Sequence, residues 1–181
     1  MLLEKDRSLL LLIDVQEKLT PFVQQSEALI ARCQWLIRLA NELGVPQLAS
    51  EQYPSGLGAT VAPLRSMISQ ENYVEKIHFS CAREPGFNEC LQVFNKKQLV
   101  LIGMETHVCV LQTAMDLQAA GFEVFVVVDA VGSRAEQDYR YGLKRMKQAG
   151  VELVTSEMVF FEWIGQAGTP QFKALSKAYL Q

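Results

Sequence analysis

The chain has 181 residues, of which 49% are hydrophobic and 20% charged, a composition typical of a globular protein rather than a disordered one. This length favours one domain, residues 1–181, with a sizeable core. The net charge of −3 gives no electrostatic footprint for nucleic acid, and the apolar run at 9–13 is too short to span a membrane.

The cysteines and histidines limit the chemistry further. No secretory signal surrounds the first apolar run, so we expect a cytoplasmic protein whose four cysteines stay reduced. The sequence has no CxxC pair and only two histidines. We therefore expect no metal centre and no cofactor.

The first half of the chain predicts three strands and one helix. The aliphatic run in 8–14 is typical of a strand buried on both faces of a parallel sheet. Apolar residues at helical spacing predict a helix over 26–43, which a glycine ends. Two more strands are predicted at 45–50 and 72–80, and the loop at 51–63 between them is rich in proline and glycine.

The second half alternates in the same way. The expected elements are a strand at 98–103, a helix from about Thr106 to Gly121, a strand at 122–130, a helix over 135–149, a strand at 151–155 and one or two closing helices in 156–164 and 170–180. This alternation predicts a three-layer α/β/α domain with a six-stranded parallel sheet in the Rossmann-like order 3-2-1-4-5-6.

In such a sheet, ligands bind beyond the carboxyl ends of the strands, where the strand order reverses. The first strand ends at Asp14, and the fourth strand leads into METHVC, residues 104–109. Because these two strands are neighbours in the predicted order, we expect Asp14 and Cys109 to face each other there. The loop at 14–22 has no glycine, which excludes a dinucleotide site after the first strand.

Cys109 is the first candidate for chemistry. If Thr106 caps the helix, Cys109 lies in the first turn, where free N–H groups and the helix dipole favour a thiolate. The alternative is a buried cysteine on the apolar stripe of Val108, Leu111 and Met115. The other cysteines lie on a core stripe or near loops and are not candidates: Cys33, Cys81 and Cys90.

Three other residues complete the set of candidates. A carboxylate after five aliphatic residues is costly unless it is paired or used, so Asp14 is either functional or a cap or turn residue. Lys76 is either an exposed lysine or one whose stem is buried among its apolar neighbours. His107 adjoins the cysteine, but adjacent helical residues point about 100° apart, so we assign it to the pocket wall or the surface.

With these residues in view, the sequence resembles the isochorismatase-like cysteine hydrolases, a family that includes nicotinamidases and carbamoylsarcosine amidohydrolase. The resemblance rests on four motifs in order: LLLIDVQ at 10–16, EKIHFS at 75–80, LIGMETHVCVLQTA at 101–114 and VVVDAVGSR at 126–134. The loop EQYPSGLG at 51–58 is similar to the isochorismatase-domain branch rather than the nicotinamidase branch.

The resemblance implies a catalytic triad of Asp14, Lys76 and Cys109. It also implies a cis peptide bond at Met104–Glu105 and an oxyanion hole formed by the backbone N–H groups of Glu105 and Cys109. The residues that it implies for the walls of the substrate pocket are Leu19, Tyr53, Phe79 and His107.

Two departures from the family narrow the expected function. The stretch at 48–60 holds no histidine or aspartate, which argues against a metal and against nicotinamide as substrate. True isochorismatases generally lack the cysteine, so Cys109 points to acyl or carbamoyl chemistry.

We therefore expect a cysteine-dependent hydrolase that acts on a small amide, carbamoyl or ureido compound through an acyl-enzyme. The alternatives are an isochorismatase-type vinyl ether hydrolase and a non-catalytic binding module of the same fold. The family commonly assembles, and the apolar segment at 158–164 would suit an interface, so a homo-oligomer is expected.

Overall fold

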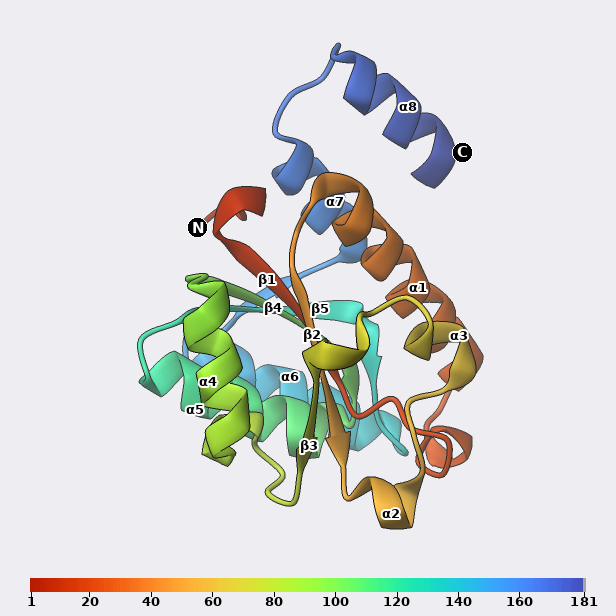
Figure 1. Ribbon diagram of the computed structural model, residues 1–181, viewed down its shortest axis with the longest axis vertical. Coiled ribbons are helices and arrows are strands. Elements are labelled where there is room, and N and C mark those ends of the chain that lie inside the picture. Colours follow the sequence, from red (N-terminus) through yellow and green to blue (C-terminus); the bar gives the residue numbers. More distant parts are fainter. Residues whose placement is uncertain (181) are drawn as a thin grey trace.

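The computed structural model describes residues 1–180, and a six-stranded sheet forms its centre (Figure 1). The strands are β1 Ser8–Ile13, β2 Gln47–Gln52, β3 Tyr73–Lys76, β4 Gln98–Met104, β5 Glu123–Gly132 and β6 Glu152–Val154. They lie in the order β3-β2-β1-β4-β5-β6, and every neighbouring pair is parallel. The predicted strand order is therefore confirmed.

Helices cover both faces of this sheet (Figure 1). They are α1 Ser26–Leu43, α2 Pro54–Leu57, α3 Ala62–Arg65, α4 Pro85–Phe94, α5 Leu111–Ala119, α6 Glu136–Gln148, α7 Ser156–Ile164 and α8 Pro170–Tyr179. Residues of α1, α3, α7 and α8 share one core cluster, and those of α4, α5 and α6 share the other. The result is the predicted three-layer α/β/α domain. Within residues 1–180, no helix is long and apolar enough to cross a membrane.

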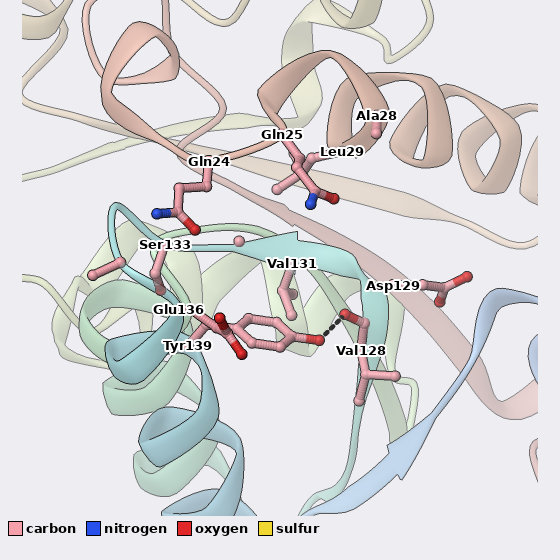
Figure 2. Close-up of a pocket in the computed structure, with 12 residues that line it drawn as sticks. Gln24, Gln25, Ala28, Leu29, Val128, Asp129, Val131, Ser133, Glu136 and Tyr139 are labelled. Carbon is pink, nitrogen blue, oxygen red and sulfur yellow. Dashed lines mark hydrogen bonds between the residues drawn. The ribbon is translucent and has the colours of Figure 1, made fainter.

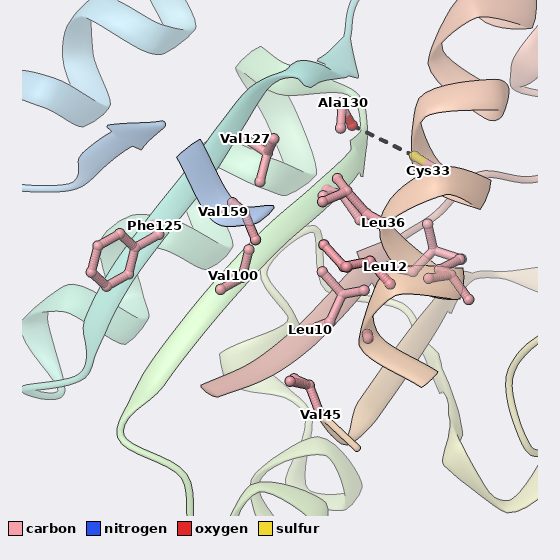
Figure 3. Packing of buried hydrophobic residues seen from close by; sticks show 14 of the residues in the cluster. Leu10, Leu12, Cys33, Leu36, Val45, Val100, Phe125, Val127, Ala130 and Val159 are labelled. Atoms are coloured by element: carbon pink, nitrogen blue, oxygen red, sulfur yellow. Dashed lines mark hydrogen bonds between the residues drawn. The ribbon is translucent and has the colours of Figure 1, made fainter. Parts of the chain in front are cut away.

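Strand β1 shows how the sequence builds the two cores. Leu10 and Leu12 pack in the cluster under α1 and α7 (Figure 3), whereas Leu9 and Leu11 pack in the cluster under α4, α5 and α6. Successive side chains of a strand point to opposite faces, so a strand that is apolar throughout must be covered on both. Cys33 belongs to the first cluster, as predicted.

Helix α4 is the main element that we did not predict from the sequence. Pro85 begins it, Phe87 and Leu91 are its buried residues, and Asn95 ends it in a left-handed conformation with φ 49°. Phe87, Cys90, Leu91 and Phe94 follow the helical spacing i, i+3, i+4, i+7 and pack in the cluster with α5 and α6, so the sequence did carry a signal for this helix. Strand β3 is also shorter than the predicted 72–80, because the chain leaves the sheet after Lys76.

Candidate active site

The carboxyl edge of the sheet brings the three predicted catalytic residues together. Asp14 follows β1, Lys76 is the last residue of β3, and Cys109 lies in a π-helical turn, Thr106–Val110, that leads from β4 into α5. The cap of this turn is Glu105, one residue before the predicted cap. All three candidates are buried, with 0%, 3% and 6% of their surface exposed, respectively.

The Lys76 ammonium is held by oxygen atoms on several sides. Its Nζ lies 2.7 Å from Oδ2 of Asp14 and donates to Oε1 of Gln52 at 2.6 Å. It also donates to the carbonyls of His78 at 3.2 Å and Phe79 at 3.0 Å. Burial is the largest single effect and lowers the pKa of Lys76, but the charges of Asp14, Cys109 and Cys81 and the hydrogen bond to Asp14 together raise it above the ordinary value. Lys76 is therefore a fixed cation at neutral pH rather than a proton carrier.

Strand β2 supplies the side chains that orient this ion pair. Ser50 donates its hydroxyl to Oδ1 of Asp14 at 2.7 Å. The amide nitrogen of Gln52 donates to the Ile77 carbonyl at 2.8 Å, which leaves its oxygen facing Lys76. Sequence reasoning missed both residues. The available signal was a polar ending, SEQ, on the strand predicted to lie beside the first one.

Asp14 itself has an unusual backbone conformation, with φ 49° in the left-handed region. Aspartate enters this region more readily than most residues because its short side chain can bond locally. Strained backbone of this kind clusters at functional sites, where the surrounding structure enforces it. Asp14 therefore follows directly after β1 in a backbone conformation that the surrounding structure enforces. It is not the cap residue of any helix in residues 1–180.

The electrostatic state of Cys109 differs from the prediction. Burial raises the pKa of the Cys109 thiol, and the charge of Asp14 and a hydrogen bond to it raise the pKa further, while Lys76 lowers it. The pKa of Cys109 is therefore not lowered as the start of a helix led us to expect, because desolvation and a nearby anion outweigh the helix start. Cys109 rests as a thiol beside a carboxylate that can take its proton. Cys81 is also buried beside this carboxylate, and burial raises its pKa to about 11.

The segment between β4 and Cys109 is where the family resemblance places an oxyanion hole. The peptide bond Met104–Glu105 is cis, where the resemblance places it. Gly103 has φ +117°, and a Cβ on it would lie 2.1 Å from the Ile13 carbonyl oxygen. A glycine is therefore required for β4 to approach β1 this closely just before the segment.

Two of the expected pocket residues, Tyr53 and Phe79, lie beside Lys76. Tyr53 and Phe79 are 55% and 54% exposed, and Leu19 is partly buried in the loop after β1. Tyr53 and Lys76 line the same hollow of about 250 Å³. The carbonyl of Phe79 binds Lys76 directly. A substrate pocket beside Lys76, at the carboxyl edge of the sheet, therefore stays a prediction.

His107 turns to partners other than the nucleophile. Its Nδ1 lies 3.0 Å from the Ser133 hydroxyl, and its Nε2 lies 3.9 Å from Asp138 on α6. A cavity of about 300 Å³ lies beyond Ser133, where Gln24 and Gln25 face Tyr139 (Figure 2). None of the three candidate catalytic residues lines it. The candidate site is therefore identified by its buried charged and nucleophilic side chains and not by the volume of a cavity.

The part of the chain that the structure describes brings no three histidine, cysteine or acidic side chains together as a metal site. The last residue of β2, Gln52, accepts a hydrogen bond from the Lys76 ammonium.

Comparison with known proteins places this chain in a family. The family model for the isochorismatase domain matches residues 8–158. The chain is 38% identical over 173 residues to isochorismatase domain-containing protein 2A of Mus musculus, covering 95% of this chain and 82% of that protein. It is 36% identical over 162 residues to isochorismatase domain-containing protein 1 of Salmo salar, covering 90% of this chain and 57% of that longer protein.

Several solved structures have the same fold as this chain over nearly all of its length. The MAR1 ribonuclease structure from Caenorhabditis elegans has a TM-score of 0.92 at 36% identity and covers 100% of this chain and 93% of that one. Escherichia coli YcaC, an octameric hydrolase of unknown specificity, has a TM-score of 0.92 at 26% identity, with 99% and 91% covered. YcaC from Pseudomonas aeruginosa, with hexane-2,5-diol and covalent acrylamide, has a TM-score of 0.91 at 25% identity, with 99% and 92% covered.

The family model covers most of the chain, and relatives above 30% identity align with nearly all of it. This protein therefore belongs to the isochorismatase domain family and has the fold of the isochorismatase-like hydrolases.

Proposed function

We propose that this protein is a cysteine-dependent hydrolase of a small amide, carbamoyl or ureido compound. Cys109 is the nucleophile, Asp14 carries the proton, and Lys76 is the fixed cation. One observation carries the proposal: a buried carboxylate lies 2.7 Å from the Lys76 ammonium and also interacts with the Cys109 thiol.

The reaction would begin with attack of the Cys109 sulfur on the carbonyl carbon while the thiol proton passes to Asp14. A C–S bond forms and the π electrons of the carbonyl move to its oxygen. The N–H groups of Glu105 and Cys109 would hold this oxyanion, and removal of one such donor typically costs about 3–4 kcal/mol. The C–N bond then breaks, and Asp14 gives its proton to the leaving amine.

Hydrolysis of the acyl-enzyme would use the same carboxylate. Asp14 takes a proton from water as the water oxygen bonds to the thioester carbon. The C–S bond then breaks, Asp14 returns the proton to the Cys109 sulfur, and the acid product leaves. Lys76 keeps a positive charge 2.7 Å from Asp14 throughout, so a cation stays beside the group that carries the proton in both steps. Its oxygen partners on β2 and on the chain after β3 hold it in place.

The test is a panel of small primary amides, carbamates and ureas, with amine release as the first readout and intact mass as the second. A covalent acyl adduct should form on Cys109. Cys109→Ala should abolish both the adduct and the turnover, whereas the matched variant Cys90→Ala on α4 should behave as wild type. Full amide turnover by Cys109→Ala would contradict the proposal.

The same panel includes two other activities. The Caenorhabditis elegans structure carries the ribonuclease name, but a net charge of −3 offers no electrostatic footprint for a phosphodiester backbone. RNA and a vinyl ether substrate are therefore added as further arms. Turnover of either that survives Cys109→Ala, without any amide turnover, would replace the proposed reaction.

We also propose that the chain forms a homo-oligomer. Escherichia coli YcaC is octameric, and α7 of this chain exposes Met158 and Phe161, of which 50% and 47% of the surface is accessible. Sedimentation velocity should show one species heavier than the monomer. A monomer at micromolar concentration would contradict this assembly.

A further inference from the structure

The side chain of Glu105 is buried, although the proposed mechanism uses only its backbone N–H. This side chain is 6% exposed, whereas its partner Arg134 is 60% exposed. Arg134 donates from Nε and Nη2 to the two carboxylate oxygens, each at 2.9 Å. A two-pronged ion pair of this kind fixes the orientation of a carboxylate as well as its position. The pair therefore ties the residue after β4 to the turn after β5.

The end of β5 and the turn after it make two more contacts with the segment that leads to the nucleophile. Gly132 pairs with Met104 in the β4–β5 register. The Ser133 hydroxyl lies 3.0 Å from Nδ1 of His107, and Figure 2 shows Ser133 at the turn between β5 and α6. The chain before Cys109 is thus held by three consecutive residues, Gly132 at the end of β5 and Ser133 and Arg134 in the turn after it, of which Arg134 is the most exposed.

We propose that Arg134 is a positioning residue for the oxyanion hole and acts through Glu105. This inference rests on the proposed function, because it concerns the Glu105 N–H donor of that mechanism. Arg134 neither contacts the reacting atoms nor moves a proton. When its two hydrogen bonds are lost, the buried carboxylate must turn toward water or take up a proton, and the peptide unit that carries the donor moves with it. A displacement of about 1 Å in such a group can cost about a hundredfold in rate.

Two probes of Cys109 separate donor geometry from simple reactivity of the thiol. Iodoacetamide reacts by displacement: a C–S bond forms, the C–I bond breaks and iodide leaves, so no charge develops on a carbonyl oxygen at the reacting carbon. Propanal reacts by addition: the sulfur bonds to the carbonyl carbon, the π electrons move to the oxygen and the thiol proton neutralises the product. Propanal needs the oxyanion donors, and it protects Cys109 from iodoacetamide according to its affinity.

Arg134→Gln should weaken protection by propanal about tenfold or more, while alkylation without propanal stays within about twofold of wild type. Arg134→Lys should lose less, because it keeps the charge but not the two-pronged geometry. The matched control is Arg83→Gln: Arg83 is 61% exposed and its Nε lies 2.9 Å from Asp116, so it pairs with a carboxylate other than Glu105. This control should protect like wild type.

The outcomes separate the two proposals. If propanal fails to protect Cys109 in the wild-type protein, the proposed function is at fault. If propanal protects wild type and Arg134→Gln equally, and both have native circular dichroism, the inference about Arg134 is overturned and the proposed function stands. If Arg134→Gln does not fold, Arg134→Lys decides, and an unchanged affinity for propanal overturns the inference.

Discussion

Replacing Lys76 by methionine tests the buried ion pair at the centre of the site. Methionine keeps much of the stem and removes the ammonium, so the packing changes little and the charge changes fully. Asp14, which is 0% exposed, then keeps one neutral hydrogen-bond donor, the Ser50 hydroxyl. Removal of one partner of a buried ion pair costs about 3–5 kcal/mol of folding free energy. If Asp14 escapes this cost by taking a proton, it can no longer accept one from Cys109, and turnover is lost.

The opposite substitution should cost less. In Asp14→Asn the Lys76 ammonium keeps three oxygen acceptors, on Gln52, His78 and Phe79. The loss is then close to that of one hydrogen bond to a charged group, about 1.5–3 kcal/mol. The double variant carries neither charge, so no buried ion is left without its partner. Its loss of unfolding free energy should therefore be smaller than the sum of the losses in the two single variants.

The measurement is urea unfolding of the four proteins, followed by circular dichroism at pH 7.5. The pKa of Lys76 is raised from the ordinary 10.5. Its stabilising contribution is therefore fully present at this pH and is lost only as the pH rises through its folded-state pKa. Arg83→Met, which breaks an exposed ion pair, is the control and should unfold like wild type. The reasoning is refuted if Lys76→Met lies within about 1 kcal/mol of wild type, well below the expected cost, or if the single losses simply add.

Three further predictions concern the nucleophile and its surroundings. Because burial and Asp14 raise the pKa of Cys109, its alkylation by iodoacetamide should still be rising with pH at pH 9, and a plateau below pH 8 in peptide mapping would contradict this. His107→Gln should keep most of the turnover, since its ring is bound on the side of β5 and α6, whereas Asp14→Asn should lose several orders of magnitude; the reverse rank in a steady-state assay would favour a cysteine–histidine dyad. Gly103→Ala should lower the thermal midpoint of unfolding strongly, because its Cβ would lie 2.1 Å from the β1 backbone. Gly86→Ala is the control and should not lower it, because a Cβ there would meet nothing within 4 Å. Equal midpoints of the two variants in calorimetry would count against the close approach of β4 and β1.

The sequence by itself determined the architecture and the three candidate catalytic residues. Apolar runs at strand length that alternate with helical periods are local properties of the chain, and they led to the parallel sheet and its order. The position of Asp14 after a strand buried on both faces, and of Cys109 after the fourth strand, followed from that order. Lys76 needed the family resemblance, because its flanking residues alone left it equally open to the surface.

The tertiary structure alone decided the state of those residues and the contacts that hold them. The predicted thiolate at Cys109 came from a local argument, the start of a helix, but its pKa is set by burial and by Asp14, which is distant in sequence. The partners Gln52 and Arg134 likewise become visible only when strands that are far apart in the chain lie side by side. Helix propensity and periodicity act over a few residues, whereas desolvation and ion pairing depend on distances that only the folded chain defines.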